Sequence, residues 1–213
     1  MDGRNSLLSR RVFAGSALAA AALVAGKFAH AAGELAPTPA QTMGPFYPVQ
    51  RLTEEDADLT WIKGHKKRAQ GKVIQVTGRV LDRQGNPVSG ARVELWQCNS
   101  LGRYAHPNDI ATAPLDPDFQ GFAAIRAGRR GEWRITTIKP AAYDSPIGRR
   151  TPHIHLTVHG TSEQLTTQMY FSDDEATNLK DGLYKNLGGE AARTVARLGA
   201  ANRYEWDIVL KGG

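Results

Sequence analysis

Short runs in which apolar and polar residues alternate, each bounded by residues that form turns, are the feature that most limits how this chain can fold. The clearest run is 204–210, where tyrosine, tryptophan, isoleucine and leucine occupy every second position. Successive side chains of a β-strand point to opposite faces, so such a run forms a strand with one buried face. Further strands are expected at 73–81, 91–97, 132–138, 152–159 and 166–171. The sequence therefore predicts an all-β fold, a β-sandwich, rather than an α/β sheet.

Helices have a minor part in this prediction. One short helix is expected near 54–56 and another over 190–198, where the helical periodicity is weak. The stretch 99–131 has little periodicity of either kind. Loops of this length in a compact domain are usually functional or disordered, and we expect the long loops of this domain to carry its site.

The N-terminus has the features of an export signal. An arginine pair, Arg10-Arg11, precedes an alanine-rich apolar run, and Ala29-His30-Ala31 offers small residues for cleavage. The pair resembles that of twin-arginine signals, whose export route carries folded proteins, often with a cofactor already inserted. We therefore expect 1–31 to be removed on export to the periplasm or the cell exterior, an N-terminal arm and linker over 32–72, and the β-domain over 73–213.

Charge and composition exclude several classes of function. The net charge is +6, but the predicted signal carries four basic residues and one acidic residue, so the mature chain is nearly balanced. Its basic clusters are not interleaved with aromatic residues, so no nucleic acid partner is expected. No apolar run reaches the roughly 18 residues of a membrane-spanning helix, and no stable membrane anchor is expected. The single cysteine excludes an intrachain disulfide and multi-cysteine metal sites.

The sharpest local motif is His153-Ile154-His155, inside a predicted strand. Residues two apart in a strand face the same side, so both imidazoles can point at one ion. Neutral imidazole suits zinc, copper, iron or nickel. Taken alone, the pair equally fits ordinary core or surface histidines. His159 lies four residues beyond His155, about 13 Å along the strand at about 3.3 Å per residue. It is not expected to join the same ion.

Further metal ligands would have to come from elsewhere in the chain. No aspartate or glutamate lies close to the histidine pair and Cys98 is distant in sequence, which argues against two histidines with one carboxylate but leaves a distant carboxylate open. Tyr104 and Tyr143 are the other candidates. A phenol with a pKa near 10 is held as phenolate at neutral pH only by a strong Lewis acid, and ferric iron does this better than zinc. Tyrosines that merely pack in loops are the alternative.

Segments throughout the mature chain resemble the intradiol ring-cleavage dioxygenases, nearest to the subunits of protocatechuate 3,4-dioxygenase. Their joint occurrence in one order is far more specific than any single motif. The segments are QTMGPFYP (41–48), VTGRV (76–80), GARVELWQ (90–97), GRY (102–104), HPND (106–109), LDPDF (115–119), TIKP (137–140), RTPHIH (150–155), TQMYF (167–171) and DIVL (207–210).

The resemblance implies a metal site. The ferric ligands of the family correspond to Tyr104, Tyr143, His153 and His155 of this sequence, and the implied cofactor is a non-haem Fe(3+) ion. Tyr143 would be the axial tyrosinate that the substrate displaces, and His155 the other axial ligand. Tyr104 and His153 would be equatorial.

The resemblance also implies a reaction. A catechol-type substrate is cleaved by O2 between its two hydroxyl-bearing carbons, giving a cis,cis-muconate-type product, with iron as Lewis acid and template. Arg150 corresponds to the family's arginine beside the reacting ring, where a fixed cation stabilises negative charge on the substrate. Gln168 corresponds to a glutamine of the same pocket.

Two features depart from the protocatechuate enzymes. Tyr143 is not followed by the Trp-Arg pair found in many of them, and the segment 143–150 is short, so protocatechuate itself is in doubt as the substrate. Protocatechuate enzymes pair two related subunits, which leaves a homo-oligomer or a related second subunit as partners of this chain. Gly44-Pro45 resembles a segment that lines the pocket, supplied by either subunit.

Two other functions compete with the dioxygenase. The segment 76–96 also resembles transthyretin-like β-sandwiches, which act as non-catalytic binding modules. A zinc or copper hydrolytic site is the other alternative. Neither accounts for the joint presence of two tyrosines, two histidines and Arg150.

Overall fold

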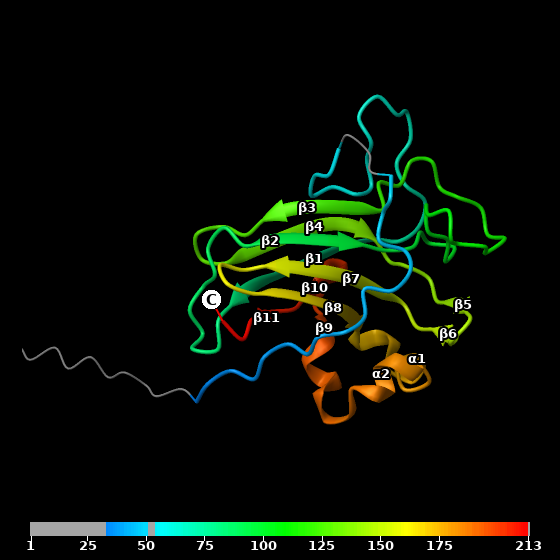
Figure 1. Ribbon diagram of the computed structural model, residues 1–213. Helices are drawn as coiled ribbons and strands as arrows, with labels where there is room; N and C mark the ends of the chain where they lie inside the picture. Colours follow the sequence, from blue (N-terminus) through cyan, green and yellow to red (C-terminus); the bar gives the residue numbers. More distant parts are fainter. Residues whose placement is uncertain (1–32, 51–53, 213) are drawn as a thin grey trace, which may run out of the picture. The chain divides into compact units, whose positions relative to one another are not determined.

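The computed structural model describes residues 33–50 and 54–212, and the predicted signal over 1–31 lies outside them (Figure 1). The strands of the described chain are β1 (Val73–Leu81), β2 (Arg92–Trp96), β3 (Phe122–Arg126), β4 (Glu132–Ile138), β5 (Tyr143–Ser145), β6 (Gly148–Arg150), β7 (His153–His159), β8 (Gln164–Phe171), β9 (Val195–Leu198), β10 (Arg203–Glu205) and β11 (Ile208–Val209). The helices are α1 (Glu175–Asn178) and α2 (Gly182–Asn186), with 3-10 turns η1 (Ser172–Asp174), η2 (Gly188–Thr194) and η3 (Ala200–Asn202). The predicted all-β class is thereby confirmed.

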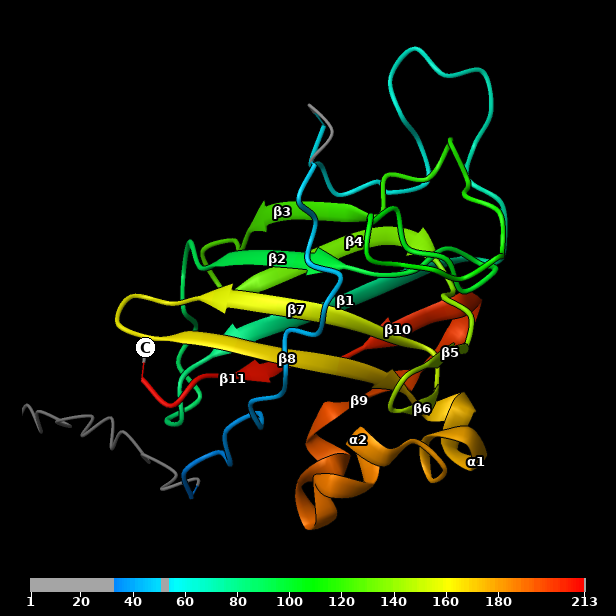
Figure 2. The same ribbon diagram turned by 45° about the vertical axis from the view of Figure 1, so that its right-hand side comes forward.

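The strands lie in two layers (Figures 1 and 2). The front layer has the order β3-β2-β7-β8, and β4, β1 and β10 lie behind it. β9 pairs in parallel with β8 and antiparallel with β10. Both layers therefore belong to one hydrogen-bonded path that curls back on itself, while β5 and β6 form a separate hairpin at the end of the sheet where β7 begins.

The main core lies between the layers. Val76 and Ile135 come from the rear layer, and Leu95 and Leu156 from the front layer, and all four are almost completely buried. The side chains that alternate with these along β2, β7 and β8 face away from the core. The outward face of the front layer is covered in turn, because the N-terminal arm crosses it (Figure 1).

The N-terminal arm is extended and runs beside the sheet. Its backbone follows two strands through the hydrogen bonds Thr38 N to Val209 O (2.9 Å) and Gln41 N to Thr166 O (2.8 Å). The Thr167 hydroxyl donates to the Pro39 carbonyl at 2.8 Å. These bonds fix the part of the chain that reaches the site.

Most predicted strands are confirmed, but the last is divided. The alternation over 204–210 holds, yet the strand is interrupted at Trp206 and Asp207 between β10 and β11. A Cβ on Gly78 of β1 would meet the Trp206 carbonyl oxygen at 1.7 Å, so the two backbones approach closely here. The carboxylate of Asp207 accepts from the Arg79 N–H at 2.8 Å in place of a ladder bond.

Both helix predictions are wrong. Residues 54–56 form no helix, and the neighbouring backbone instead pairs with β4 at the bridge between Asp58 and Thr136. Residues 190–198 divide between the 3-10 turn η2 and strand β9, because pairing with β8 and β10 overrides a weak helix propensity. The stretch 99–131 contains β3, which its small, unpatterned residues did not indicate. Within the described ranges, no helix is long and apolar enough to cross a membrane.

Candidate metal centre

The outward face of the front layer carries a row of cross-strand neighbours. Phe122 opposes Trp96, Trp96 opposes His155, and His155 opposes Gln168 in register. All four side chains are buried. His155 is therefore held in the middle of the layer, between strands that are hydrogen-bonded on both sides.

The two histidines converge, as the spacing predicted. Their Nε2 atoms are 3.2 Å apart, and both rings are buried at the start of β7. The Nδ1 atom of His153 lies 2.6 Å from the Thr151 carbonyl, which can only accept, so the proton is on Nδ1 and Nε2 keeps a lone pair. Burial lowers the pKa of His153 to about 3, which keeps the ring neutral. A neutral pair of this kind presents nitrogen lone pairs to a cation.

Tyr104 reaches the histidines from the loop after β2. The side chain of Asn99 shapes this loop by accepting from the Leu101 and Arg103 N–H groups at 2.9 and 3.0 Å. Asp109 accepts from the Tyr104 N–H at 2.6 Å. The Tyr104 hydroxyl is buried, and no other described residue offers it a hydrogen-bond partner by distance and angle.

Tyr143 comes from the other side, on the β5–β6 hairpin. It stands opposite Arg150 in register. A Cβ on Gly102 would lie 3.1 Å from both the Ala142 carbonyl oxygen and the Tyr143 Cβ, and Gly102 has a φ of +81°. A glycine at this position therefore lets the Tyr104 loop pack directly against Tyr143.

The four predicted ligands form one cluster of rings. The centroids are 5.5 Å apart for Tyr104 and Tyr143, 5.6 Å for Tyr143 and His153, and 6.3 Å for Tyr104 and His155. The structure thus brings together side chains from the loop after β2, from β5 and from β7.

The phenols of this cluster are protonated unless a cation stabilises the charge. Burial raises the pKa of Tyr143 to about 12, although nearby Arg150 favours ionisation. Burial, with Tyr143 as neighbour, raises the pKa of Tyr104 well above its usual value. Cys98 packs in the same aromatic cluster, where its thiol donates to the Ala141 carbonyl at 3.4 Å and burial raises the pKa of the thiol to about 12. Two neutral imidazoles and two phenols that need a strong Lewis acid fit a ferric ion.

Arg150 and Gln168 lie together, as predicted for neighbours of a reacting ring. Arg150 Nη2 donates to the Gln168 Oε1 at 2.6 Å, and Arg150 is 5% exposed. Gln168 Nε2 donates to the Thr42 carbonyl of the arm at 3.0 Å. The guanidinium therefore stands next to the ring cluster, across the β5–β6 hairpin from Tyr143.

The chain's own arm, which carries Gly44-Pro45, lies over the cluster. A Cβ on Gly44 would lie 3.2 Å from His155 Cε1, so the arm backbone rests on that imidazole. Phe46 stacks on Tyr104 with centroids 4.5 Å apart and meets Tyr143 edge-on at 6.2 Å. These contacts exclude water from one side of the cluster.

Other metal-binding residue types lie elsewhere. His159, at the far end of β7, has its Nε2 3.7 Å from a Glu94 oxygen and is separate from the cluster, as predicted. Within residues 33–50 and 54–212, no three His, Cys, Asp or Glu side chains form a metal-binding group. Tyr104 and Tyr143 are the phenols that the structure places next to the histidines.

Several residues of the site were missed by sequence reasoning. Asp181 binds Arg150, Tyr170 lies 3.2 Å from Gln168 through its hydroxyl, and Gln41 accepts from that hydroxyl at 3.0 Å. Trp96 stacks on His155 with centroids 5.0 Å apart and planes 10° apart. Gln41, Trp96 and Tyr170 fall inside the family-like segments quoted above, which was the available signal, whereas Asp181 had none.

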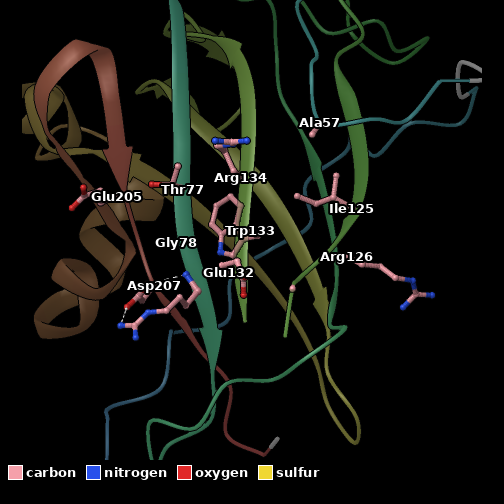
Figure 3. A pocket seen from close by; sticks show the side chains of 12 residues that line it. Ala57, Thr77, Gly78, Ile125, Arg126, Glu132, Trp133, Arg134, Glu205 and Asp207 are labelled. Carbon is pink, nitrogen blue, oxygen red and sulfur yellow. Dashed lines mark hydrogen bonds and ion pairs between the residues drawn. The ribbon is translucent and has the colours of Figure 1, made fainter. Parts of the chain in front are cut away.

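One large cavity lies away from this cluster. It measures about 890 Å³ and is lined from β1 and β4 by residues such as Thr77, Trp133 and Arg134 (Figure 3). None of the six predicted site residues lines it. A cavity of about 450 Å³ does adjoin the cluster, with Phe46 and Tyr104 in its wall. The chemistry of the side chains therefore locates the site better than cavity size.

Comparisons with known proteins show which family the chain belongs to. A family model described as dioxygenase matches residues 42–212. The chain is 40% identical over 182 residues to the protocatechuate 3,4-dioxygenase beta chain of Burkholderia cepacia, covering 79% of this chain and 77% of that one. It is 29% identical over 189 residues to the protocatechuate 3,4-dioxygenase alpha chain of Burkholderia cepacia, covering 82% and 92%. The dioxygenase domain of a carbohydrate-binding fusion from Streptomyces sp. SirexAA-E aligns with a TM-score of 0.64 at 25% identity, covering 84% of this chain and 100% of that one.

Proposed function

The chain belongs to the intradiol ring-cleavage dioxygenases, and we propose that it uses a ferric ion to cleave a catechol-type ring with O2 between the two hydroxyl-bearing carbons. The product is a cis,cis-muconate-type diacid, in which both atoms of O2 are retained. The observation that carries the proposal is the convergence of Tyr104, Tyr143, His153 and His155 in one buried cluster. A non-catalytic transthyretin-like module would need none of these contacts.

The cluster supplies the donors that a ferric ion prefers. His153 and His155 would bind it through Nε2, and Tyr104 and Tyr143 through their hydroxyl oxygens. Two phenolates offset two of its three charges. The bound ion would supply Lewis acidity, drawing electron density from the catechol so that a ring carbon reacts with O2.

The chain's own residues bind and orient the substrate. Tyr143 is more exposed than Tyr104, at 9% against 3%, and lies opposite Arg150. We assign to the Tyr143 oxygen the acceptance of one hydroxyl proton from the incoming catechol. Arg150 donates hydrogen bonds to the oxygen on which negative charge develops, and Gln168 fixes the guanidinium. Phe46 and the arm keep water from the reacting ring.

The visible spectrum and the iron content of the purified protein test this function. We expect about one iron per chain, a burgundy colour from tyrosinate bound to ferric iron, and a shift of that band when catechol is added without O2. Admitting O2 should then give a muconate-type product. A protein that stays colourless after aerobic ferric loading would contradict the proposal and favour a binding module.

The architecture and assembly of the protein extend the proposal. The two layers support a β-sandwich in which the loop after β2 carries Tyr104 and the β5–β6 hairpin carries Tyr143, behind the arm and linker expected over 32–72. The relatives include alpha and beta chains of one enzyme, which supports either a homo-oligomer or a related second subunit here. The protein purified alone separates the two. A homo-oligomer gives a multiple of the chain mass in light scattering and is active, whereas a chain that requires a second subunit is inactive by itself.

The location of the protein is also proposed. We propose that residues 1–31 direct export by the twin-arginine route to the periplasm or the cell exterior. Replacing Arg10-Arg11 with Lys-Lys should retain the protein in the cytoplasm with its N-terminus intact. Export of that variant at the normal level would contradict the twin-arginine route.

A further inference from the structure

A buried carboxylate, Asp181, binds the arginine of the site. Its side chain is 0% exposed, and its Oδ2 accepts from Arg150 Nε at 2.8 Å. The same oxygen accepts from the Thr151 N–H at 3.0 Å. Asp181 therefore contacts the last residue of β6 and the residue after it, immediately before the histidine strand.

The second oxygen of Asp181 holds a helix. Oδ1 accepts from the Leu183 and Tyr184 N–H groups, at 2.8 and 3.2 Å, and so caps the N-terminus of α2. Together the two oxygens accept four hydrogen bonds, about as many as an ionised carboxylate can take. Asp181 is thus fixed in place by α2 and can fix Arg150 in turn.

The contacts of Arg150 define the direction of its guanidinium. Nε is held by Asp181 and Nη2 by Gln168, from two separate elements. A guanidinium has five N–H donors, of which one donates to Asp181 and one to Gln168, and the Tyr170 hydroxyl also interacts with the group. The planar group is therefore held on two sides, with donors left for a substrate.

The charges of the pair are also matched. A buried guanidinium without a counter-ion is strongly unfavourable. Burial opposes the ionisation of Asp181, but the attraction of Arg150 and the hydrogen bonds from Arg150 and the backbone outweigh it, so the pKa of the carboxyl lies below its usual value. The pair adds no net charge to the pocket, so Arg150 acts by the direction of its hydrogen bonds.

We propose that Asp181 is a positioning residue for ring cleavage: it acts through Arg150, aiming the guanidinium at the catechol, and it couples α2 to the site. This role rests on the proposed function, because Arg150 has a substrate to orient only if the cluster is a catechol site. None of the four predicted ligands hydrogen-bonds to Asp181. Asp181 should therefore influence turnover without influencing the metal.

Asp181→Asn tests the role in the purified iron-loaded protein. The amide keeps only one oxygen, so its NH2 group must face either the Arg150 and Thr151 donors or the N–H groups at the start of α2. We expect kcat to fall about 10- to 100-fold, the size of effect that misplacement by about 1 Å produces. We expect KM for catechol not to rise, because the pocket gains a positive charge. Iron content and the visible band should be those of the wild type. Asp181→Ser is the second variant, because serine keeps an N-cap for α2 but does not reach Arg150.

A double-mutant cycle separates positioning from a structural role. In an Arg150→Ala background, Asp181→Asn should change kcat less than threefold, because the group it acts through is gone. Asp173→Asn is the control: this carboxylate is also ion-paired, to Lys139, but contacts none of the site residues, and its kcat should be unchanged.

Two results would overturn the role of Asp181. One is a wild-type kcat in both Asp181 variants, and the other is the same loss of kcat in the wild-type and Arg150→Ala backgrounds. An inactive, iron-free wild type would instead mean that the proposed function has failed. The two failures are therefore distinguishable.

Discussion

Replacing Gly44 by alanine tests whether the arm is part of the site. Gly44 has a φ of +69°, and a Cβ there would lie 3.2 Å from His155 Cε1. That distance is shorter than the ~3.5 Å at which carbon atoms make favourable contact. His155 cannot move away from the new methyl group, because Trp96 stacks on the ring at a centroid distance of 5.0 Å. The arm must therefore lift or the imidazole must tilt.

Two effects of this substitution can be estimated. The left-handed backbone costs an alanine about 1 to 2 kcal/mol, which lowers the melting temperature by about 2 to 8 °C in a domain of this size. Tilting His155 should in addition weaken iron binding about 10- to 100-fold, as disturbances around a metal ligand commonly do. We expect the Gly44→Ala protein to be purified with less iron and to turn over catechol more slowly.

Gly90→Ala is the matched control. Gly90 has a φ of +75°, and no atom lies within 4 Å of the position its Cβ would take. This variant therefore has the backbone strain of Gly44→Ala without a contact. Melting temperatures, iron content and kcat are measured for both. Equal iron content and equal kcat in the two variants would refute the claim that the arm rests on His155.

Three further predictions concern the ligands and the fold. Tyr143→Phe should alter the visible band while part of the iron stays bound, and an unchanged spectrum would remove Tyr143 from the metal. His155→Ala should lose most iron and activity; activity at the wild-type level would rule out a metal site with both histidines. The third prediction concerns the ion pair of Lys139 and Asp173. Burial opposes the charge of each group, but their contact and the neighbouring hydrogen bonds outweigh burial. The pKa of Lys139 therefore lies above 10.5 and that of Asp173 below 3.8. The stabilisation that Asp173 gives the folded state is lost as pH falls through its lowered pKa. The stabilisation that Lys139 gives is lost as pH rises through its raised pKa. Lys139→Met should therefore lower the unfolding free energy by about 1 to 3 kcal/mol between about pH 5 and 9. In urea titrations this difference should shrink at both extremes, and a pH-independent difference would contradict the ion pair.

Local patterns predicted those parts of the molecule that depend on neighbours in sequence. The spacing of His153 and His155 requires only that their segment be a strand, and it is one. The chemistry of phenols made Tyr104 and Tyr143 candidates beside packing tyrosines, and the resemblance decided between these readings, because residues in two separate segments show no common periodicity. Period-two alternation placed the last strand correctly and missed its break, which depends on the close approach of Gly78 to a residue 128 positions away.

The parts that were not predictable depend on contacts between distant segments. Asp181 reaches Arg150 across 31 residues, and nothing in its own segment marks it as different from any acidic residue before a short helix. The segment 190–198 contains good helix formers, but β9 is required between β8 and β10 to continue the sheet. Tertiary pairing decided these cases, and a single sequence does not display it.

The elements that carry the cluster differ in how firmly they are held, and this difference bears on mechanism. His153 and His155 lie on β7, which pairs along its length with β8 and, over 155–159, with β2. Tyr143 lies on a hairpin of two short strands that pair only with each other among the described elements. A ligand that leaves the metal when substrate binds must move, whereas ligands that hold the metal through turnover must not. The placement of Tyr143 on the hairpin, and of both imidazoles within the sheet, is therefore the arrangement that displacement of Tyr143 by a catechol requires.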